Sequence, residues 1–211
     1  MKLSRLTVKN YRSITTAHQL NIEELTVLIG QNNEGKSNLL AALVTAMNVV
    51  SRLGMQPLTR GRLRSGYWLH KLYEWERDFP VSLQTDNADG ASVFRLDFQL
   101  TADEQRKFQR NVGSKLNDTL PIEVSLGRAD PIIKIVKRGP GSKSLNEKLD
   151  AIARFVGQRM EVAYIPAVRT ARAAERVIEA MVRRELQVLR QEKTYKAAVR
   201  RVRRLERPLL N

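Results

Sequence analysis

The segment VLIGQNNEGKSNLL, residues 27–40, most constrains what this chain can fold into. Gly30, four intervening residues and then Gly35, Lys36 and Ser37 fit the formula of a phosphate-binding loop. The apolar run Leu25–Ile29 precedes the loop, and apolar residues at helical spacing follow it as far as Gly54. A buried strand, a glycine-bounded loop and a helix in this order are what such a loop requires. A coincidental glycine-rich turn explains the pattern poorly.

The chemistry of such a loop depends on its backbone. Successive N–H groups converge on phosphate oxygens, the helix N-terminus adds the positive end of its dipole, and glycine permits close approach where a Cβ would obstruct it. We predict that Lys36 contacts the β- and γ-phosphates and that the Ser37 hydroxyl binds Mg²⁺, which makes these two the candidate catalytic residues. ATP is the expected nucleotide because no Asn-Lys-x-Asp motif for guanine follows. The predicted binding residues of the loop are Gly30, Gln31, Asn32, Asn33, Glu34, Gly35, Lys36, Ser37 and Asn38.

Strands and helices are also predicted outside the loop. Leu3–Tyr11 and Val93–Leu100 alternate as strands, and the apolar runs on either side of GRADP, residues 127–131, predict a hairpin with a long loop. Residues 161–165 predict a further buried strand. We expect these strands to form a mixed or antiparallel sheet.

Two capping boxes predict where helices begin. Thr101 with Glu104 starts one helix that should end near Gly113, and Ser144 with Glu147 starts another. Residues 170–207 contain no glycine or proline and have apolar residues at mostly three-to-four spacing. A helix of this length would extend roughly 55 Å, which is too long for an ordinary core helix.

These patterns predict an α/β chain with two parts. Residues 1–169 form the first part, with the phosphate-binding loop at 30–37 and a strand-rich insert at about 91–137. Residues 170–211 form a long basic helical arm, which we expect to be truncated. From Ala171 onward the sequence has twelve Lys and Arg residues but only five Glu residues.

Charge limits the possible partners. The net charge is +15 and the pI is near 10.5, so the chain should be attracted to polyanions, of which nucleic acid is the commonest. The solvated face of a long helix accounts for much of the same charge equally well. The absence of cysteine excludes disulfides and thiolate zinc sites, and the sequence shows neither a signal peptide nor a membrane span. We expect a cytoplasmic protein without a membrane partner.

Other polar and aromatic residues are weaker candidates for a site. The aromatic residues Trp68, Tyr73 and Trp75 lie near several basic residues and could stack on a nucleic-acid strand. A patch that anchors a long loop or meets another lobe explains them at least as well. The only two histidines, His18 and His70, have no partners at metal-ligand spacing. Turn and cap chemistry explains three aspartates better than a metal cluster does: Asp86, Asp89 and Asp103.

The stretch LTVKNYRSI, residues 6–14, and the later LTVLIGQNNEGKSNLLAAL together resemble the N-terminal lobe of the ABC-type ATPases of genome maintenance. These include the RecF, SMC and double-strand-break-repair head domains and the OLD (overcoming lysogenization defect) nucleases. The resemblance rests on Lys9–Ser13 and on a phosphate loop spelled Gly-x-Asn-x-x-Gly-Lys-Ser-Asn. YIPAVR, residues 164–169, is most similar to OLD and related AAA-type ATPases.

The resemblance implies a P-loop fold in which Arg12 lies near the nucleotide phosphates, whereas without it a solvated charge beside a strand is the simpler interpretation. It implies that two heads form a homodimer or higher oligomer around two ATP molecules, and that DNA binds the basic surface or arm. The family also has a glutamine between its lobes, a signature motif, a strand ending in Asp-Glu and a histidine switch, none of which is found here. We therefore expect these residues alone to bind nucleotide weakly and to hydrolyse it scarcely at all. The resemblance implies a C-terminal lobe that completes the site, in the same or a separate chain. In OLD proteins a Toprim nuclease domain follows that lobe.

Two alternatives remain open at this point. One is a non-hydrolytic scaffold module in which the basic helix contacts DNA or a protein and the loop holds nucleotide structurally. The other is a small-molecule kinase, which would need a substrate lid and catalytic acids that we cannot locate in the sequence.

Overall fold

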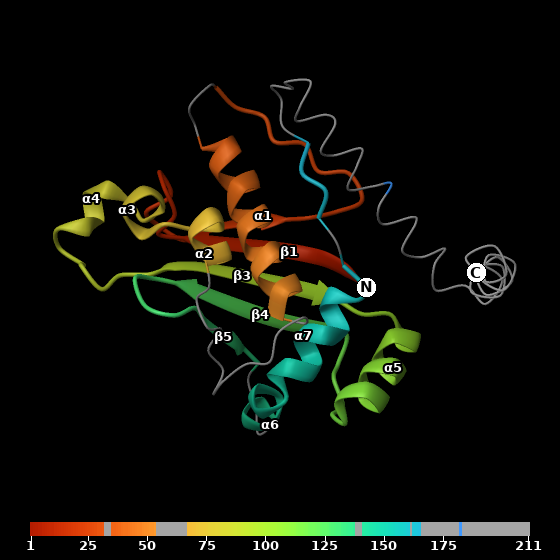
Figure 1. Cartoon of the computed structure of the whole chain (residues 1–211). Helices are drawn as coiled ribbons and strands as arrows, with labels where there is room; N and C mark the ends of the chain where they lie inside the picture. Colours follow the sequence, from red (N-terminus) through yellow and green to blue (C-terminus); the bar gives the residue numbers. More distant parts are fainter. Residues whose placement is uncertain (32–34, 54–66, 138–140, 161, 166–181, 183–211) are drawn as a thin grey trace, which may run out of the picture. The chain divides into compact units, whose positions relative to one another are not determined.

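The computed structural model describes residues 1–31, 35–53, 67–137, 141–160, 162–165 and 182. The chain forms two units, Met1–Val162 and Ala163–Asn211, and each is described by itself. The first unit is α/β, with a five-stranded antiparallel sheet and helices (Figure 1). Nearly all of the predicted basic arm lies outside the described residues, so its long helix stays a prediction.

The sheet has the strand order β2-β1-β3-β4-β5, and every neighbouring pair is antiparallel. The predicted first strand, the strand near residue 93 and the hairpin around GRADP are confirmed. The strand-rich insert extends the sheet directly from β1, because β3 pairs along the length of β1. The short β2 was not predicted, since its residues HQLN are mostly polar and exposed. The strands are β1 (Lys2–Lys9), β2 (His18–Asn21), β3 (Ser92–Gln99), β4 (Thr119–Leu126) and β5 (Ile132–Ile135).

The longest described helix, α1, begins at the end of the phosphate-loop motif, as predicted, and extends to Leu53, while the predicted stop at Gly54 lies outside the described residues. It packs against α7, and Figure 1 shows both helices on one face of the sheet. The helices are α1 (Lys36–Leu53), α2 (Tyr67–Leu72), α3 (Trp75–Asp78), α4 (Val81–Gln84), α5 (Ala102–Val112), α6 (Ser142–Glu147) and α7 (Leu149–Gly157).

The core lies between the sheet and these helices. Because side chains alternate between the two faces of a strand, one face of β1, β3 and β4 supplies a row of fully buried apolar residues. The opposite face is polar: Arg95 pairs in register with Glu123, and Glu123 with Lys134. Ion pairs on this face join Lys134 to Glu123 at 2.8 Å and Arg95 to Asp97 at 2.9 Å. The buried row contains Leu6, Val8, Phe94, Leu96, Phe98, Leu120, Ile122 and Val124.

The two predicted capping boxes had different outcomes. The first is confirmed, because Thr101 caps α5 and its side chain accepts a hydrogen bond from the Glu104 N–H. Gly113 ends this helix in the left-handed conformation. The second is wrong, because α6 begins at Ser142 with Gly141 at its N-cap. Ser144 therefore lies inside the helix.

The predicted buried strand before the phosphate loop is not found. Leu25, Val27 and Ile29 are 82%, 66% and 90% exposed, and residues 26–30 have no regular secondary structure. The physical reason is pairing: the five strands pair with one another, and none of the described residues forms a ladder with this segment. The strand predicted at 161–165 differs in the same way, since residues 162–165 are irregular and Tyr164 and Ile165 are half exposed. Residue 161 lies outside the described part.

Among the described residues, no helix combines the length and the apolar character needed to cross a membrane.

Candidate functional site

The predicted Gly35, Lys36 and Ser37 lie at the N-terminus of α1. Gly35 adopts φ +85°, a left-handed conformation that side chains other than glycine rarely adopt. Lys36 and Ser37 then begin the helix, and the Leu39 N–H donates to the Gly35 carbonyl at 2.9 Å. The first turn of α1 contains no Asp or Glu, so no carboxylate within that turn offsets the positive end of the helix dipole. The end of the helix therefore favours an anion.

The Lys36 side chain folds back over the start of the loop. Its Nζ donates to the carbonyl of Gly30 at 2.6 Å and also to the carbonyl of Gln31. The Ser37 side chain is exposed to solvent. Asn32, Asn33 and Glu34 lie outside the described residues, so the convergence of their N–H groups on a phosphate stays a prediction.

The turn after β1 is unusually constrained. Tyr11 and Ile14 exchange backbone hydrogen bonds of 2.8 and 2.9 Å, which close the turn. Asn10 has φ 56° and Arg12 has φ 53°, so two residues with side chains adopt the left-handed conformation. For an arginine this conformation costs about 1–2 kcal/mol. Surrounding contacts must therefore hold the turn in place.

The same turn contacts the start of α1, although the two are far apart in sequence. Asn38 Nδ2 donates to the Ser13 hydroxyl at 2.8 Å. A Cβ added to Gly35 would lie 3.3 Å from the same hydroxyl oxygen. Ser13 thus lies against the phosphate-loop helix, and its chain neighbour Arg12 is brought to this end of α1.

Arg12 is bound to Asp78, which sequence analysis did not identify. Arg12 Nε donates to Asp78 Oδ1 at 2.8 Å, and the Arg12 N–H donates to the Asp78 carbonyl at 2.6 Å. The Asp78 side chain is 0% exposed, whereas that of Arg12 is 36% exposed. No spacing signal in the sequence links these two residues, because only the tertiary fold brings α3 to the turn.

Hydrogen bonds from its partners keep the Asp78 carboxylate ionised. Burial by itself raises the pKa of Asp78, but hydrogen bonds from Arg77, the Glu74 N–H and Arg12 outweigh burial and hold the pKa below its ordinary value. Arg77 Nη2 donates to Oδ2 at 2.6 Å and the Glu74 N–H donates to the same oxygen at 3.0 Å. The charge is therefore paired and hydrogen-bonded, as a buried carboxylate requires.

The aromatic residues near α3 belong to the core. Tyr73 and Trp75 are buried, and Trp75 Nε1 donates to the Gly90 carbonyl at 2.7 Å. For these two residues the anchoring interpretation is correct, and stacking on a nucleic-acid strand is wrong. The neighbouring arginines at 60, 62 and 64 lie outside the described residues.

The other candidate residues form no second site. His18 and His70 are exposed, and Asp103 pairs with Lys107 at 2.6 Å in the first turns of α5. Within the described ranges, no group of three or more His, Cys, Asp or Glu could hold a metal ion.

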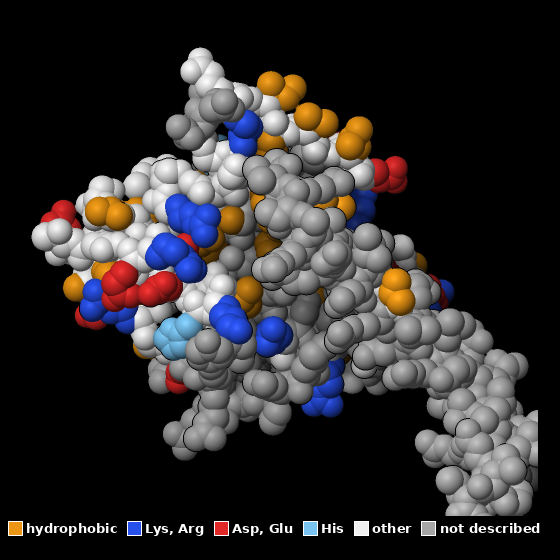
Figure 2. All heavy atoms as spheres, turned by 45° about the horizontal axis from the view of Figure 1, so that its top comes forward, with side chains coloured by type: hydrophobic (Ala, Val, Ile, Leu, Met, Phe, Trp, Pro, Cys, Tyr) orange, Lys and Arg blue, Asp and Glu red, His pale blue; other side chains and the backbone are white. Residues whose placement is uncertain are grey.

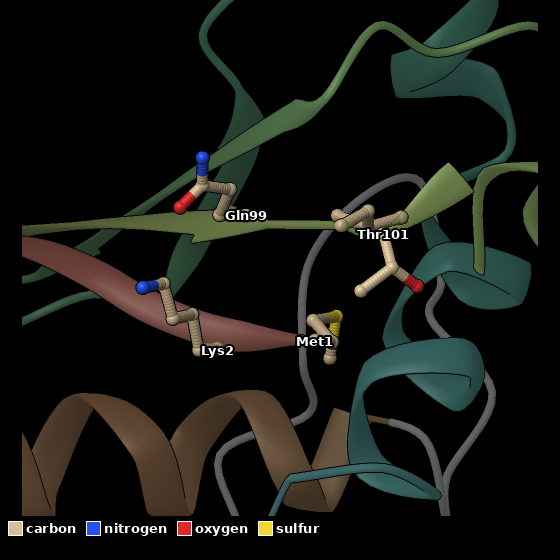
Figure 3. A pocket seen from close by; sticks show the side chains of 5 residues that line it. Met1, Lys2, Gln99 and Thr101 are labelled. Carbon is tan, nitrogen blue, oxygen red and sulfur yellow. The ribbon is translucent and has the colours of Figure 1, made fainter. Parts of the chain in front are cut away.

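A pocket of about 320 Å³ lies between the start of β1 and the end of β3 (Figure 3). Lys2 and Gln99 line it from neighbouring strands, with Met1, Leu100 and Thr101 beside them. The turn that holds Arg12 follows the opposite end of β1, about 26 Å away for a strand of eight residues. The pocket is therefore separate from the phosphate-loop site.

Comparison with known proteins identifies the same segment. The model of the AAA ATPase domain family matches residues 1–52, which include β1, the turn, the loop motif and nearly all of α1. An uncharacterized protein of Methanocaldococcus jannaschii is 46% identical over 43 residues, which are 20% of this chain and 13% of that protein. The matched part is thus a small share of the relative's length. These findings support an AAA-type ATPase N-terminus at residues 1–52.

Proposed function

We propose that this chain is the ATP-binding N-lobe of an OLD-, RecF- or SMC-like ATPase that acts on DNA in repair or in defence against phage. The observation that carries the proposal is the start of α1. There a left-handed Gly35 is followed by Lys36 and Ser37, and the Lys36 ammonium binds carbonyls of the loop, within the segment that matches the AAA ATPase domain. This arrangement fits a nucleotide phosphate group.

The described residues suit ATP and Mg²⁺. Lys36 would bind the phosphates and the exposed Ser37 hydroxyl would bind Mg²⁺, which neutralises charge on the β- and γ-phosphate oxygens. Gly35 leaves room that a Cβ would fill, and Arg12 is held at the same end of α1.

Exposed apolar residues support a second lobe. Figure 2 brings the top of the Figure 1 view forward and shows hydrophobic side chains on that face, and Leu25, Val27 and Ile29 directly before the loop are exposed. Apolar surface of this kind marks an interaction site. In the proposed function it receives a C-terminal lobe, in the same or a separate chain, that supplies the groups for water activation. Two heads then dimerise around ATP.

Calorimetric titration with ATP and Mg²⁺ tests the binding site. We expect Lys36→Ala to weaken binding about tenfold or more, because a charge-assisted contact to the phosphates is lost. Lys107→Ala, which removes an equal charge from α5, should leave the affinity unchanged. Equal binding by the wild type and Lys36→Ala would contradict the site.

An ATPase assay tests whether the site is incomplete. The pure chain should hydrolyse ATP at close to the background rate. Turnover that disappears in Lys36→Ala would show instead that these residues are sufficient.

A DNA-binding experiment distinguishes the proposed ATP-controlled head from a non-hydrolytic scaffold module. With a net charge of +15, the chain should bind DNA with an affinity that falls steeply as salt rises. In an ATP-controlled head, ATP changes this affinity and Lys36→Ala abolishes the change. Binding that ignores both ATP and Lys36→Ala would favour the non-hydrolytic scaffold.

A further inference from the structure

We propose that Asp78 is the positioning residue of Arg12, and that it holds the Arg12 guanidinium beside the phosphate-binding loop so that the guanidinium binds the nucleotide phosphates. The inference rests on the proposed function, since it requires nucleotide at the loop. It assigns a role to a buried carboxylate that lies far from the loop in sequence.

Asp78 binds Arg12 at two points. The Asp78 carbonyl accepts the Arg12 backbone N–H at 2.6 Å, and the carboxylate accepts Nε at 2.8 Å. The first contact stabilises the left-handed backbone at φ 53°, and the second fixes the direction of the side chain. A guanidinium has five N–H donors, and a bond through Nε approaches it from the side. The bond uses one edge of the guanidinium and leaves the donors of the opposite edge to a second partner, on a side chain that keeps part of its surface exposed.

The turn brings Arg12 to the end of α1 where the loop lies. Ser13, next to Arg12, accepts a hydrogen bond from Asn38 in the first turn of α1 and lies against Gly35. The turn is therefore bound to α1 on one side and to α3 on the other. An arginine held between these contacts is preorganised for an anion at the start of α1.

Asp78 has a rigid support of its own. In α3 and just after it, Trp75 and Phe79 stack with ring centroids 5.0 Å apart, and both are buried. Trp75 also donates to the Gly90 carbonyl, which fastens α3 beside β3. Because these contacts hold α3 in place, the Asp78 carboxylate offers Arg12 a hydrogen-bond acceptor at a fixed position.

Arg77 provides a matched control. It binds the other carboxylate oxygen of Asp78 and lies 3.6 Å from Glu74, and among the described residues its hydrogen bonds and ion pairs go to these two residues. If Asp78 acts through Arg12, loss of Arg77 should matter much less than loss of Arg12.

Calorimetry with Mg²⁺ and ATP on the 211-residue chain tests the role. We expect Asp78→Asn and Arg12→Ala each to weaken ATP binding about tenfold, while the double variant is no weaker than Arg12→Ala alone. Arg12→Lys should bind as weakly as Arg12→Ala, because lysine lacks Nε. Arg77→Ala should stay within about twofold of the wild type, because the Glu74 N–H and Arg12 still bind the Asp78 carboxylate and Arg12 keeps its partner.

Hydrogen exchange provides a second measurement that needs no variant at buried Asp78. Adding ATP and Mg²⁺ to the wild type should slow amide exchange at residues 10–14 and 74–79 together with the start of α1. Slower exchange at α1 alone would overturn the positioning role even if Asp78→Asn fails to fold.

The outcomes distinguish this role from the proposed function. ATP binding that depends on Lys36 but is unchanged in Asp78→Asn, or effects of Asp78→Asn and Arg12→Ala that simply add, would overturn the role of Asp78 alone. If the wild type binds no more ATP than Lys36→Ala does, the proposed function fails and the role of Asp78 fails with it.

Discussion

The hydroxyl groups of Tyr73 and Ser92 lie 3.0 Å apart in the core, and the Ser92 hydroxyl in turn donates to the backbone carbonyl of Asn10. Asn10 begins the turn that holds Arg12, and it adopts a left-handed conformation. Tyr73 therefore supports the turn through Ser92, while Asp78 and Asn38 bind it directly. A residue buried in the core thus contributes to the geometry beside the phosphate loop.

Removing the Tyr73 hydroxyl should destabilise the fold. Tyr73→Phe leaves the apolar ring in place but breaks the bond to Ser92, so we expect the free energy of unfolding to fall by about 1 kcal/mol. Urea denaturation at neutral pH measures the change. Tyr164→Phe, at a half-exposed position, is the control and should have little effect.

The Tyr73 phenol should also make the stability of the fold depend on pH in the alkaline range. Burial raises the pKa of Tyr73 to about 12. Because an unfolded tyrosine ionises near pH 10, its contribution to stability is complete below about pH 10 and is lost as the pH rises toward 12. Unfolding free energies measured across this range should fall less steeply for Tyr73→Phe than for the wild type. Parallel curves would contradict the assignment.

The contribution of Asp78 to stability should depend on pH in the opposite direction, and in the acid range. Its pKa is lowered in the folded state, so its contribution is present above the unfolded value of about 4 and is lost as the pH falls through the folded pKa. We expect Asp78→Asn to lose about 1–3 kcal/mol at neutral pH and less as the pH falls below about 4. Melting temperatures across the acid range measure this difference. Exposed Asp89→Asn should follow the wild-type curve, and an Asp78→Asn deficit independent of pH would argue against an ionised partner.

Gly90 predicts a steric effect. A Cβ at this position would overlap Phe79 Cζ and lie 2.8 Å from Asn87 Nδ2. Phe79 is buried and stacked on Trp75, so it has little room to move. Gly90→Ala should therefore cost about 1–3 kcal/mol in urea denaturation. Gly141→Ala, where the added Cβ meets nothing within 4 Å, should cost less than about 1 kcal/mol, as a change at a helix N-cap does.

Val27 tests the exposed segment before the loop. Because its side chain is mostly exposed, Val27→Ser should change the free energy of unfolding by less than about 0.5 kcal/mol. Val8→Ser, at a fully buried position of β1, should cost more than about 2 kcal/mol. A large loss in Val27→Ser would show that the segment is packed, as its sequence first predicted.

Local patterns predicted many elements because their physical causes are local. The Thr101 capping box, the glycine at 113 and the alternation in β3 each depend on residues that are neighbours in the chain. Leu25–Ile29 shows the limit of such patterns. A run of apolar residues indicates a tendency to be buried, but burial needs a partner strand, and none of the described strands pairs with it.

The sequence by itself determined the phosphate-loop motif, the helix that follows it and the basic charge, because spacing and composition are sufficient to define them. Only the tertiary structure decided which residues surround the start of α1. Pairing of β1 with β3 brings the turn, α3 and α1 together. Arg12 can then donate a hydrogen bond to Asp78, and Asn38 can donate one to Ser13. Contacts between residues so far apart in the chain depend on how the sheet and helices pack, which no local pattern records.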